Sequence, residues 1–320
     1  MNYPASFILL LFLCFNLTNL AQDGTNVKSF APEIFSQYPA VRDFTIASDG
    51  MEAYFTAQSY LGELSVVMRM NYADDHWQPA EVVSFSGRYP DLEPFLESDG
   101  LKLWFASKRP RNDSVANDYD IWFVERASKE SDWSEAKNLG EPVNSRYNEY
   151  YPSLAENGTI YFTSDRSGSF GEDDIFSSVW DGMQFRNPEN LGAGINSKGY
   201  EYNAFISPDE SLILFGGYNR TDGFGSGDIY ISYRTKDGKW NRATNLGSVV
   251  NSDNMDYCPF VNSTRETMYF TSKRSNLNTA QSYRTRSSLL KEINKYDNGS
   301  SRIYQVPFHE VLKATKNFPQ

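Results

Sequence analysis

Cysteine, histidine and basic residues are scarce in this chain of 320 residues. It has two cysteines, two histidines, and 30 lysines and arginines against 41 aspartates and glutamates. With only His76 and His309 available, a triad that uses histidine as its base and a metal site with several histidine ligands are both disfavoured. The net charge of −11 disfavours nucleic acid and anionic membrane surfaces as partners, because both select basic proteins. We predict no cofactor and no metal.

The N-terminal segment has an apolar run over residues 7–15 that is followed by polar sequence from residue 22. The run is too short to span a bilayer comfortably, and its position indicates a signal peptide over residues 1–21. A lipid anchor on Cys14 is disfavoured because the residues before it are bulky. We therefore expect an exported protein of the periplasm or cell exterior that is not an integral membrane protein.

Cys258 would be the only cysteine left after cleavage, which excludes an intramolecular disulfide bond. It lies in an apolar strand pattern and is expected to be a buried small side chain, not a reactive thiol. Stability must then come from packing alone. The C-terminal tail, residues 307–320, is expected to dock one or two helical turns over residues 311–316 on the main body.

An internal repeat is the strongest signal in the sequence. A turn followed by an aromatic strand recurs five times, with the aligned turn positions 50 to 58 residues apart at Gly50, Gly100, Gly158, Glu210 and Arg265. This spacing suits a four-stranded propeller blade. Consecutive apolar residues within the strands indicate that both faces of each sheet are covered.

Further landmarks recur within each copy. A third strand opens with Asp-Ile-aromatic at residues 120–122, 174–176 and 228–230, and fourth strands are predicted to begin at Trp77, Trp133, Phe185 and Trp240. An arginine follows most second strands, at Arg109, Arg166, Arg220 and Arg274.

The last copy lacks a fourth strand, and residues 32–35 resemble fourth-strand sequence. We predict an all-β fold, a single propeller over residues 30–306, closed by this N-terminal segment as a strand of the last blade. Closure would remove exposed sheet edges. The pattern favours five blades, with six left open if residues 276–300 contain another.

These repeats resemble the WD40-like repeat of TolB-type β-propellers of the bacterial envelope, over nearly all of residues 30–306. The second and third copies match best, while Glu210 replaces the usual glycine of the fourth and the fifth has lost its Asp-Gly turn. The resemblance implies a propeller of the envelope. It does not define an activity, because the repeat family includes binding scaffolds, peptidase propellers and relatives of polysaccharide lyases.

Equivalent positions of the five inner strands carry acidic and aromatic residues that should line one mouth of the central channel. The predicted ligand-binding set is Arg42, Asp91, Glu93, Glu149, Tyr150, Glu201, Tyr202, Asp256 and Tyr257. The competing interpretation is that the carboxylates pair with the recurrent arginines and serve only packing.

Two smaller features are left open. Residues 172–174 are a possible weak calcium site. The last copy has a basic insertion, either a docking element or a solvated loop, with Arg284, Arg286, Lys291 and Lys295.

The sequence favours a non-enzymatic propeller that binds an envelope protein or glycan at the channel mouth. The alternative is a carbohydrate-active enzyme, a glycosidase or lyase, that uses two mouth carboxylates; a purely structural envelope component is a third interpretation. Residues 223–227 do not form a nucleophile elbow, because Phe224 stands where glycine is required. No catalytic residue is assigned from the sequence.

Overall fold

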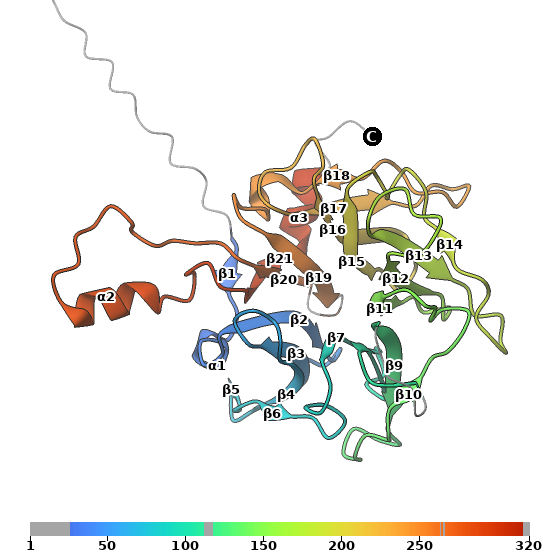
Figure 1. Ribbon diagram of the computed structural model, residues 1–320, viewed down its shortest axis with the longest axis horizontal. Coiled ribbons are helices and arrows are strands. Elements are labelled where there is room, and N and C mark those ends of the chain that lie inside the picture. Colours follow the sequence, from blue (N-terminus) through green and yellow to red (C-terminus); the bar gives the residue numbers. More distant parts are fainter. Residues whose placement is uncertain (1–25, 112–117, 263, 265, 316–320) are drawn as a thin grey trace, which may run out of the picture.

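Five antiparallel sheets surround a central axis and form the blades of a propeller (Figure 1). The computed structural model describes residues 26–111, 118–262, 264 and 266–315. The predicted all-β propeller with five four-stranded blades is confirmed. Residues 276–300, which left a sixth blade open, instead contain the helix α2 (Arg286–Ile293). The predicted signal peptide, residues 1–21, and Cys14 lie outside the described residues.

Each blade is a meander whose first strand lines the axis. Blade 1 consists of β2 (Ala40–Ile46), β3 (Glu52–Gln58), β4 (Ser65–Ala73) and β5 (His76–Trp77), with β6 (Glu81–Val82) also paired to β4. Blade 2 consists of β7 (Asp91–Leu96), β8 (Lys102–Ser107), β9 (Asp120–Glu125) and β10 (Lys137–Asn138). Blade 3 consists of β11 (Glu149–Leu154), β12 (Ile160–Ser164), β13 (Asp174–Ser178) and β14 (Glu189–Asn190).

The last two blades follow the same order. Blade 4 consists of β15 (Tyr200–Ile206), β16 (Leu212–Tyr218), β17 (Asp228–Tyr233) and β18 (Thr244–Asn245), followed by the 3-10 turn η1 (Gly247–Val249). Blade 5 consists of β19 (Asp256–Asn262), β20 (Thr267–Ser272), β21 (Arg302–Pro307) and β1 (Lys28–Ser29). The consecutive residues Leu103, Trp104 and Phe105 are all buried, so both faces of a blade are covered as predicted.

The N-terminal segment closes the ring, although not with the predicted residues. Strand β1 pairs antiparallel with β21, with Ser29 opposite Tyr304. Residues 32–35 form the short helix α1 (Pro32–Phe35), so their assignment as the closing strand is wrong. The physical reason is local: Ala31 adopts a positive φ of 40° that turns the chain out of the sheet, and Pro32 suits the first turn of a helix because it has no N–H to donate.

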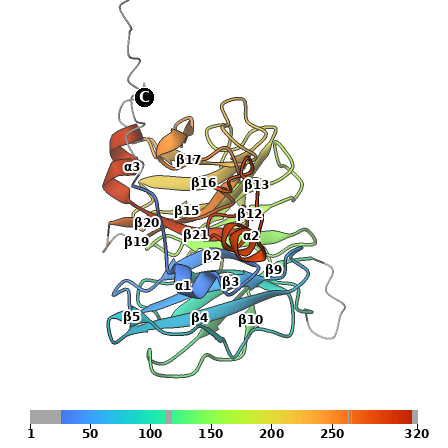
Figure 2. The same ribbon diagram turned by 90° about the vertical axis from the view of Figure 1, so that its left-hand side faces the viewer.

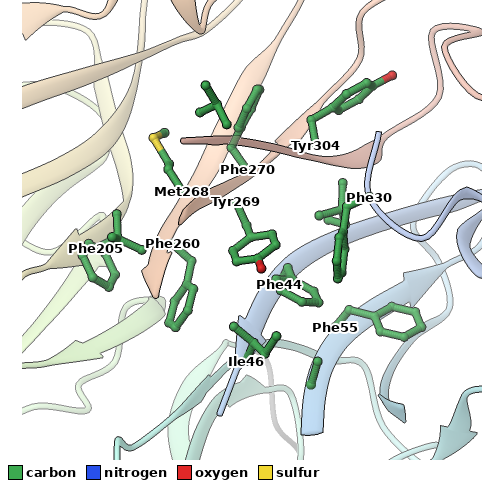
Figure 3. Close-up of a cluster of buried hydrophobic side chains, with 14 of the residues drawn as sticks. Phe30, Phe44, Ile46, Phe55, Phe205, Phe260, Met268, Tyr269, Phe270 and Tyr304 are labelled. Carbon is green, nitrogen blue, oxygen red and sulfur yellow. The ribbon is translucent and has the colours of Figure 1, made fainter. Parts of the chain in front are cut away.

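An aromatic cluster surrounds this closure (Figure 3). The ring of Phe30 lies 5.0 Å from the rings of both Phe44 and Tyr269 and 5.8 Å from the ring of Trp77. Its backbone N–H donates to the carbonyl of Ile303 at 3.1 Å. The closing segment is thereby held by packing between blades 1 and 5 as well as by strand pairing.

The fourth strands have two residues each and do not begin at the predicted aromatics. Only Trp77 lies in a strand; Trp133, Phe185 and Trp240 precede β10, β14 and β18. Trp133 instead donates through Nε1 to the hydroxyl of Tyr54 at 3.1 Å, across the boundary between blades 2 and 1. Packing between blades decides the position of this side chain.

Two helices lie outside the ring. Helix α2 projects from the body on the loop between β20 and β21 (Figure 1), and Figure 2 shows α3 (Phe308–Thr315) along the edge of the sheets. Val311 of α3 is buried, which confirms the predicted docking of the C-terminal helix. Among the described residues, no helix has the length and apolar character needed to cross a membrane.

Replacing Phe30 with alanine should lower the free energy of unfolding by about 3 kcal/mol, because a large aromatic side chain leaves a cavity at the closure. Urea denaturation of the purified protein measures this. Leu61→Ala is the matched control, since Leu61 is 77% exposed and should change stability by less than about 0.5 kcal/mol. Equal effects of the two variants would contradict this account of closure.

Candidate functional site

Each of the five inner strands is interrupted by a β-bulge at the same position. Strand pairing shifts register there in all five blades. The bulged residue has a left-handed backbone, with φ between 48° and 63°, in every blade: Asp43, Glu93, Tyr151, Asn203 and Cys258. Bulges re-aim side chains, and non-glycine residues in this conformation mark backbone strain that surrounding structure must hold in place. We call these five residues the axial ring.

Side chains of the axial ring meet one another across the channel. The Cys258 thiol donates to Asp43 Oδ1 at 2.8 Å, and Asn203 Nδ2 donates to Glu93 Oε1 at 3.1 Å. The hydroxyl of Tyr151 reaches the carbonyl of Pro259 at 3.1 Å. Residues 108 to 215 positions apart in sequence therefore share one buried polar cluster.

A threonine of the preceding blade supports three of the five bulges. The hydroxyl oxygens of Thr271, Thr56 and Thr163 accept from the backbone N–H groups of Asp43, Glu93 and Asn203 at 3.1–3.3 Å. The equivalent residues of blades 2 and 4 are Ala106 and Gly216. Ala106 leaves the N–H of Tyr151 without a threonine acceptor, and Gly216 leaves room for a side chain beside the strand.

The first of these departures concerns Glu93. Because Ala106 has no hydroxyl, the N–H of Tyr151 donates to Glu93 Oε2 instead, at 2.8 Å. Glu93 Oε1 accepts from Arg42 Nη2 at 2.9 Å. Burial raises the pKa of Glu93 to about 8, against the opposing effect of the Arg42 guanidinium. Glu93 therefore holds a proton to higher pH than an ordinary glutamate does.

The second departure concerns Tyr202. A Cβ atom at Gly216 would lie 2.7 Å from the Tyr202 ring, and one at Gly227 would lie 2.6 Å from its hydroxyl. Glycine at both positions gives the ring its place. The Tyr202 hydroxyl is buried and has no hydrogen-bond partner among the described residues. It is a polar group without a partner in the wall of the pocket described next.

Above the axial ring lies a pocket of about 630 Å³. Five residues of the predicted set line it: Arg42, Glu93, Tyr150, Tyr202 and Tyr257. The remaining lining residues are Thr163, Asp173, Tyr200, Asn203, Tyr218, Ser226 and Met255. The pocket is thus lined by aromatic rings and by the buried carboxyl group of Glu93.

Asp173 is the second carboxyl group of the pocket. Burial, reinforced by the neighbouring carboxylates Asp165, Glu172 and Asp174, raises its pKa to about 6. It therefore ionises while Glu93 is still protonated. The sequence analysis considered Asp173 only within residues 172–174, as part of a weak calcium site, and did not place it in the ligand-binding set.

Four predicted carboxylates lie inside the blades and do not line the pocket. Each of them is completely buried and accepts from one arginine of the recurrent series: Asp91 from Arg109 at 2.7 Å, Glu149 from Arg166 at 2.8 Å, Glu201 from Arg220 at 2.8 Å, and Asp256 from Arg274 at 3.0 Å. Each also accepts from a nearby serine hydroxyl. This is the packing arrangement that the sequence analysis weighed as the competing interpretation.

Asp43 and Cys258 complete the polar cluster beneath the pocket. Arg42 Nε donates to Asp43 Oδ1 at 2.7 Å, and the Arg42 guanidinium lies 5.2 Å from the centre of the Tyr257 ring. Burial next to Asp43 raises the pKa of the Cys258 thiol well above its usual value. Cys258 is buried as predicted, but its surroundings are polar.

Metal binding finds no support in the described part of the chain, where no group of three or more His, Cys, Asp or Glu residues is arranged to hold an ion. At residues 172–174, Asp174 Oδ2 accepts from the backbone N–H of Phe170 at 2.6 Å. The Asp174 carboxylate therefore holds the loop between β12 and β13 by accepting from its backbone.

Comparisons with known proteins bear on the fold. No protein-family model matches the chain, and no curated protein matches it. Among solved structures, the chain is similar to a glycoside hydrolase (TM-score 0.53, 9% identity, covering 83% of this chain and 86% of that one). It is also similar to an arabinanase of Bacillus subtilis (TM-score 0.50, 15%, 83% and 93%) and a putative TolB of Agrobacterium tumefaciens (TM-score 0.47, 15%, 72% and 69%).

At these identities the similarity shows the fold. The structures with TM-scores of 0.50 or more include glycan-cleaving enzymes. This finding corrects the expectation of a non-enzymatic binding propeller, which is wrong.

The paired carboxylates generate a stability prediction. Asp91→Asn should lower the free energy of unfolding by roughly 3 kcal/mol, because it leaves the charge of Arg109 unpaired in a nearly buried position. Chemical denaturation measures the loss. In the control, Glu125→Gln, the change should stay below about 1 kcal/mol, since Glu125 and Lys137 form an exposed pair. An Asp91→Asn protein as stable as the wild type would show that the pair is not structural.

Proposed function

We propose that this protein is a glycoside hydrolase that binds a glycan in the pocket over the axial ring, with Glu93 as the general acid. The observation that carries the proposal is the buried carboxyl group of Glu93, whose pKa is raised to about 8 within an aromatic-lined pocket. Glycosidic cleavage at neutral pH needs such a group, because the leaving oxygen must receive a proton.

The pocket has the components for sugar binding. The rings of Tyr200 and Tyr218 lie 5.8 Å apart and, with Tyr150, offer apolar faces on which a sugar ring can stack. The Arg42 guanidinium supplies polar contacts for sugar hydroxyl groups. Arabinan is the first substrate to test, because an arabinanase is among the similar structures.

The two pocket carboxyl groups divide the chemistry. Glu93 gives its proton to the glycosidic oxygen as the bond from that oxygen to the anomeric carbon breaks. Asp173, ionised above pH 6, takes a proton from the water that adds to the anomeric carbon. The different environments that separate their pKa values also assign the acid and the base.

The setting of this activity belongs to the same proposal. Repeat sequences of the WD40-like TolB type and the apolar N-terminal run support an exported protein of the bacterial envelope. A glycan of that compartment or of the cell exterior would be its partner. Fractionation of the producing cell tests this location.

Glu93→Gln should reduce kcat on the glycan that the wild type cleaves by about 10²- to 10⁴-fold, because the proton donor is lost. Its melting temperature should fall, because the amide nitrogen cannot accept from Tyr151 N–H or from Arg42 as a carboxyl oxygen does; circular dichroism must show that the variant is folded at the assay temperature. Reducing-sugar release from a panel of arabinan, polygalacturonan and xylan, with their oligosaccharides, is the assay.

Glu156→Gln is the matched control, because Glu156 lines a separate pocket with Phe95, Phe205 and Phe260 and should leave turnover unchanged. No turnover of any glycan of the panel by the wild type, or full activity of Glu93→Gln, would disprove the assignment.

The pH dependence of kcat/KM should be bell-shaped, with limbs near pH 6 and pH 8. Activity falls below the lower value as Asp173 becomes protonated and above the upper value as Glu93 loses its proton. Initial rates between pH 4 and 10 measure the profile. In Asp173→Asn the remaining activity should lose the acid limb; an unchanged acid limb would exclude Asp173 as the base.

A further inference from the structure

The loops that join the second and third strands of blades 3 and 4 are built to the same plan. In blade 3, the backbone N–H groups of Phe170 and Gly171 donate to the two oxygens of Asp174, at 2.6 and 3.3 Å. In blade 4, those of Phe224 and Gly225 donate to Asp228 in the same way, at 2.5 and 3.3 Å. One carboxylate thus closes each loop on its own third strand.

Both loops are also pressed against the next blade. A Cβ atom on Gly171 would lie 2.1 Å from the carbonyl oxygen of Gly199, and one on Gly225 would lie 2.1 Å from that of Asn254. The N–H of Glu172 donates to the Gly199 carbonyl at 3.1 Å. The loops therefore hold their side chains at set positions.

Each loop carries one exposed phenylalanine a few residues from a residue that lines the pocket. Phe170 is 55% exposed and Phe224 is 57% exposed. Three residues after Phe170, Asp173 lines the pocket, and two residues after Phe224, Ser226 does the same. Just over half of the surface of each phenylalanine is left in water, and that part adds nothing to the stability of the fold, because burial of apolar surface is what stabilises it.

The aromatic residues favour one side of the mouth. Four tyrosines of the pocket lie on the blades that carry the two phenylalanines. Blade 3 contributes Tyr150, and blade 4 contributes Tyr200, Tyr202 and Tyr218. Arg42 and Glu93 come from blades 1 and 2. Most of the pocket tyrosines and both exposed phenylalanines therefore belong to the same two blades.

We propose that Phe170 and Phe224 are outer stacking platforms for a polymeric glycan, so that the substrate is a polysaccharide whose chain leaves the pocket across blades 3 and 4. This inference rests on the proposed function, since the pocket sugar and the platform sugars belong to one chain. Stacking on an exposed ring adds affinity for sugar units beyond those in the pocket, which short oligosaccharides lack.

Binding is measured by affinity electrophoresis of Glu93→Gln protein in gels containing linear arabinan, polygalacturonan or xylan. Adding Phe170→Ala and Phe224→Ala together should weaken binding of the retained polymer about tenfold. Met183→Ala, at an 88% exposed residue of the turn after β13, is the control and should bind as the parent does. In the wild-type background, the double substitution should change kcat/KM on arabinotriose less than twofold.

Three results would overturn the platforms: unchanged retention of the double variant, an equal loss on trisaccharide and polymer, or a parent that no polymer retards. The two proposals fail separately. If the wild type hydrolyses nothing but Glu93→Gln binds a polymer through the phenylalanines, the platforms stand and the hydrolase assignment falls. If polymer is hydrolysed equally well without the two rings, the hydrolase stands and the platforms fall.

Discussion

One bulge in each inner strand is the constraint on which the site depends. A left-handed backbone at a residue other than glycine costs roughly 1–3 kcal/mol, and here it occurs at five equivalent positions. Hydrogen bonds from three bulges to threonines of the preceding blade offset part of that cost. Because the ring is closed, every blade has a preceding neighbour, and the strain brings five unlike side chains to one axis.

Repetition and departure from it have different consequences. Where the blades agree, as in the four buried pairs between arginine and carboxylate, the residues hold each blade together. Where the blades differ, side chains near the axis make contacts that the other blades lack. Ala106 in place of threonine leaves the Tyr151 N–H to Glu93, and Gly216 in place of threonine admits the ring of Tyr202.

Carboxyl groups of similar depth therefore have different roles. Asp91 and Glu93 are two residues apart on one strand, and both are buried. Asp91 accepts from a serine and an arginine of its own blade, so its charge is used for packing. Glu93 faces the axis in a strained bulge, where burial raises its pKa against the opposing effect of Arg42. The position relative to the bulge decides between structure and proton transfer.

The sequence alone determined the architecture, because a blade is a local unit whose turns, strand lengths and apolar runs recur in the chain. Five copies and a missing last strand were enough to predict a closed five-bladed ring, with Arg42, Glu93 and three tyrosines at its mouth. The closing strand was predicted at residues 32–35 but lies at residues 28–29, because the turn at Ala31 and Pro32 directs the chain into a helix. Only the tertiary structure separated Glu93 from the other carboxylates, because its partners Arg42 and Asn203 come from blades far apart in sequence that burial brings into contact.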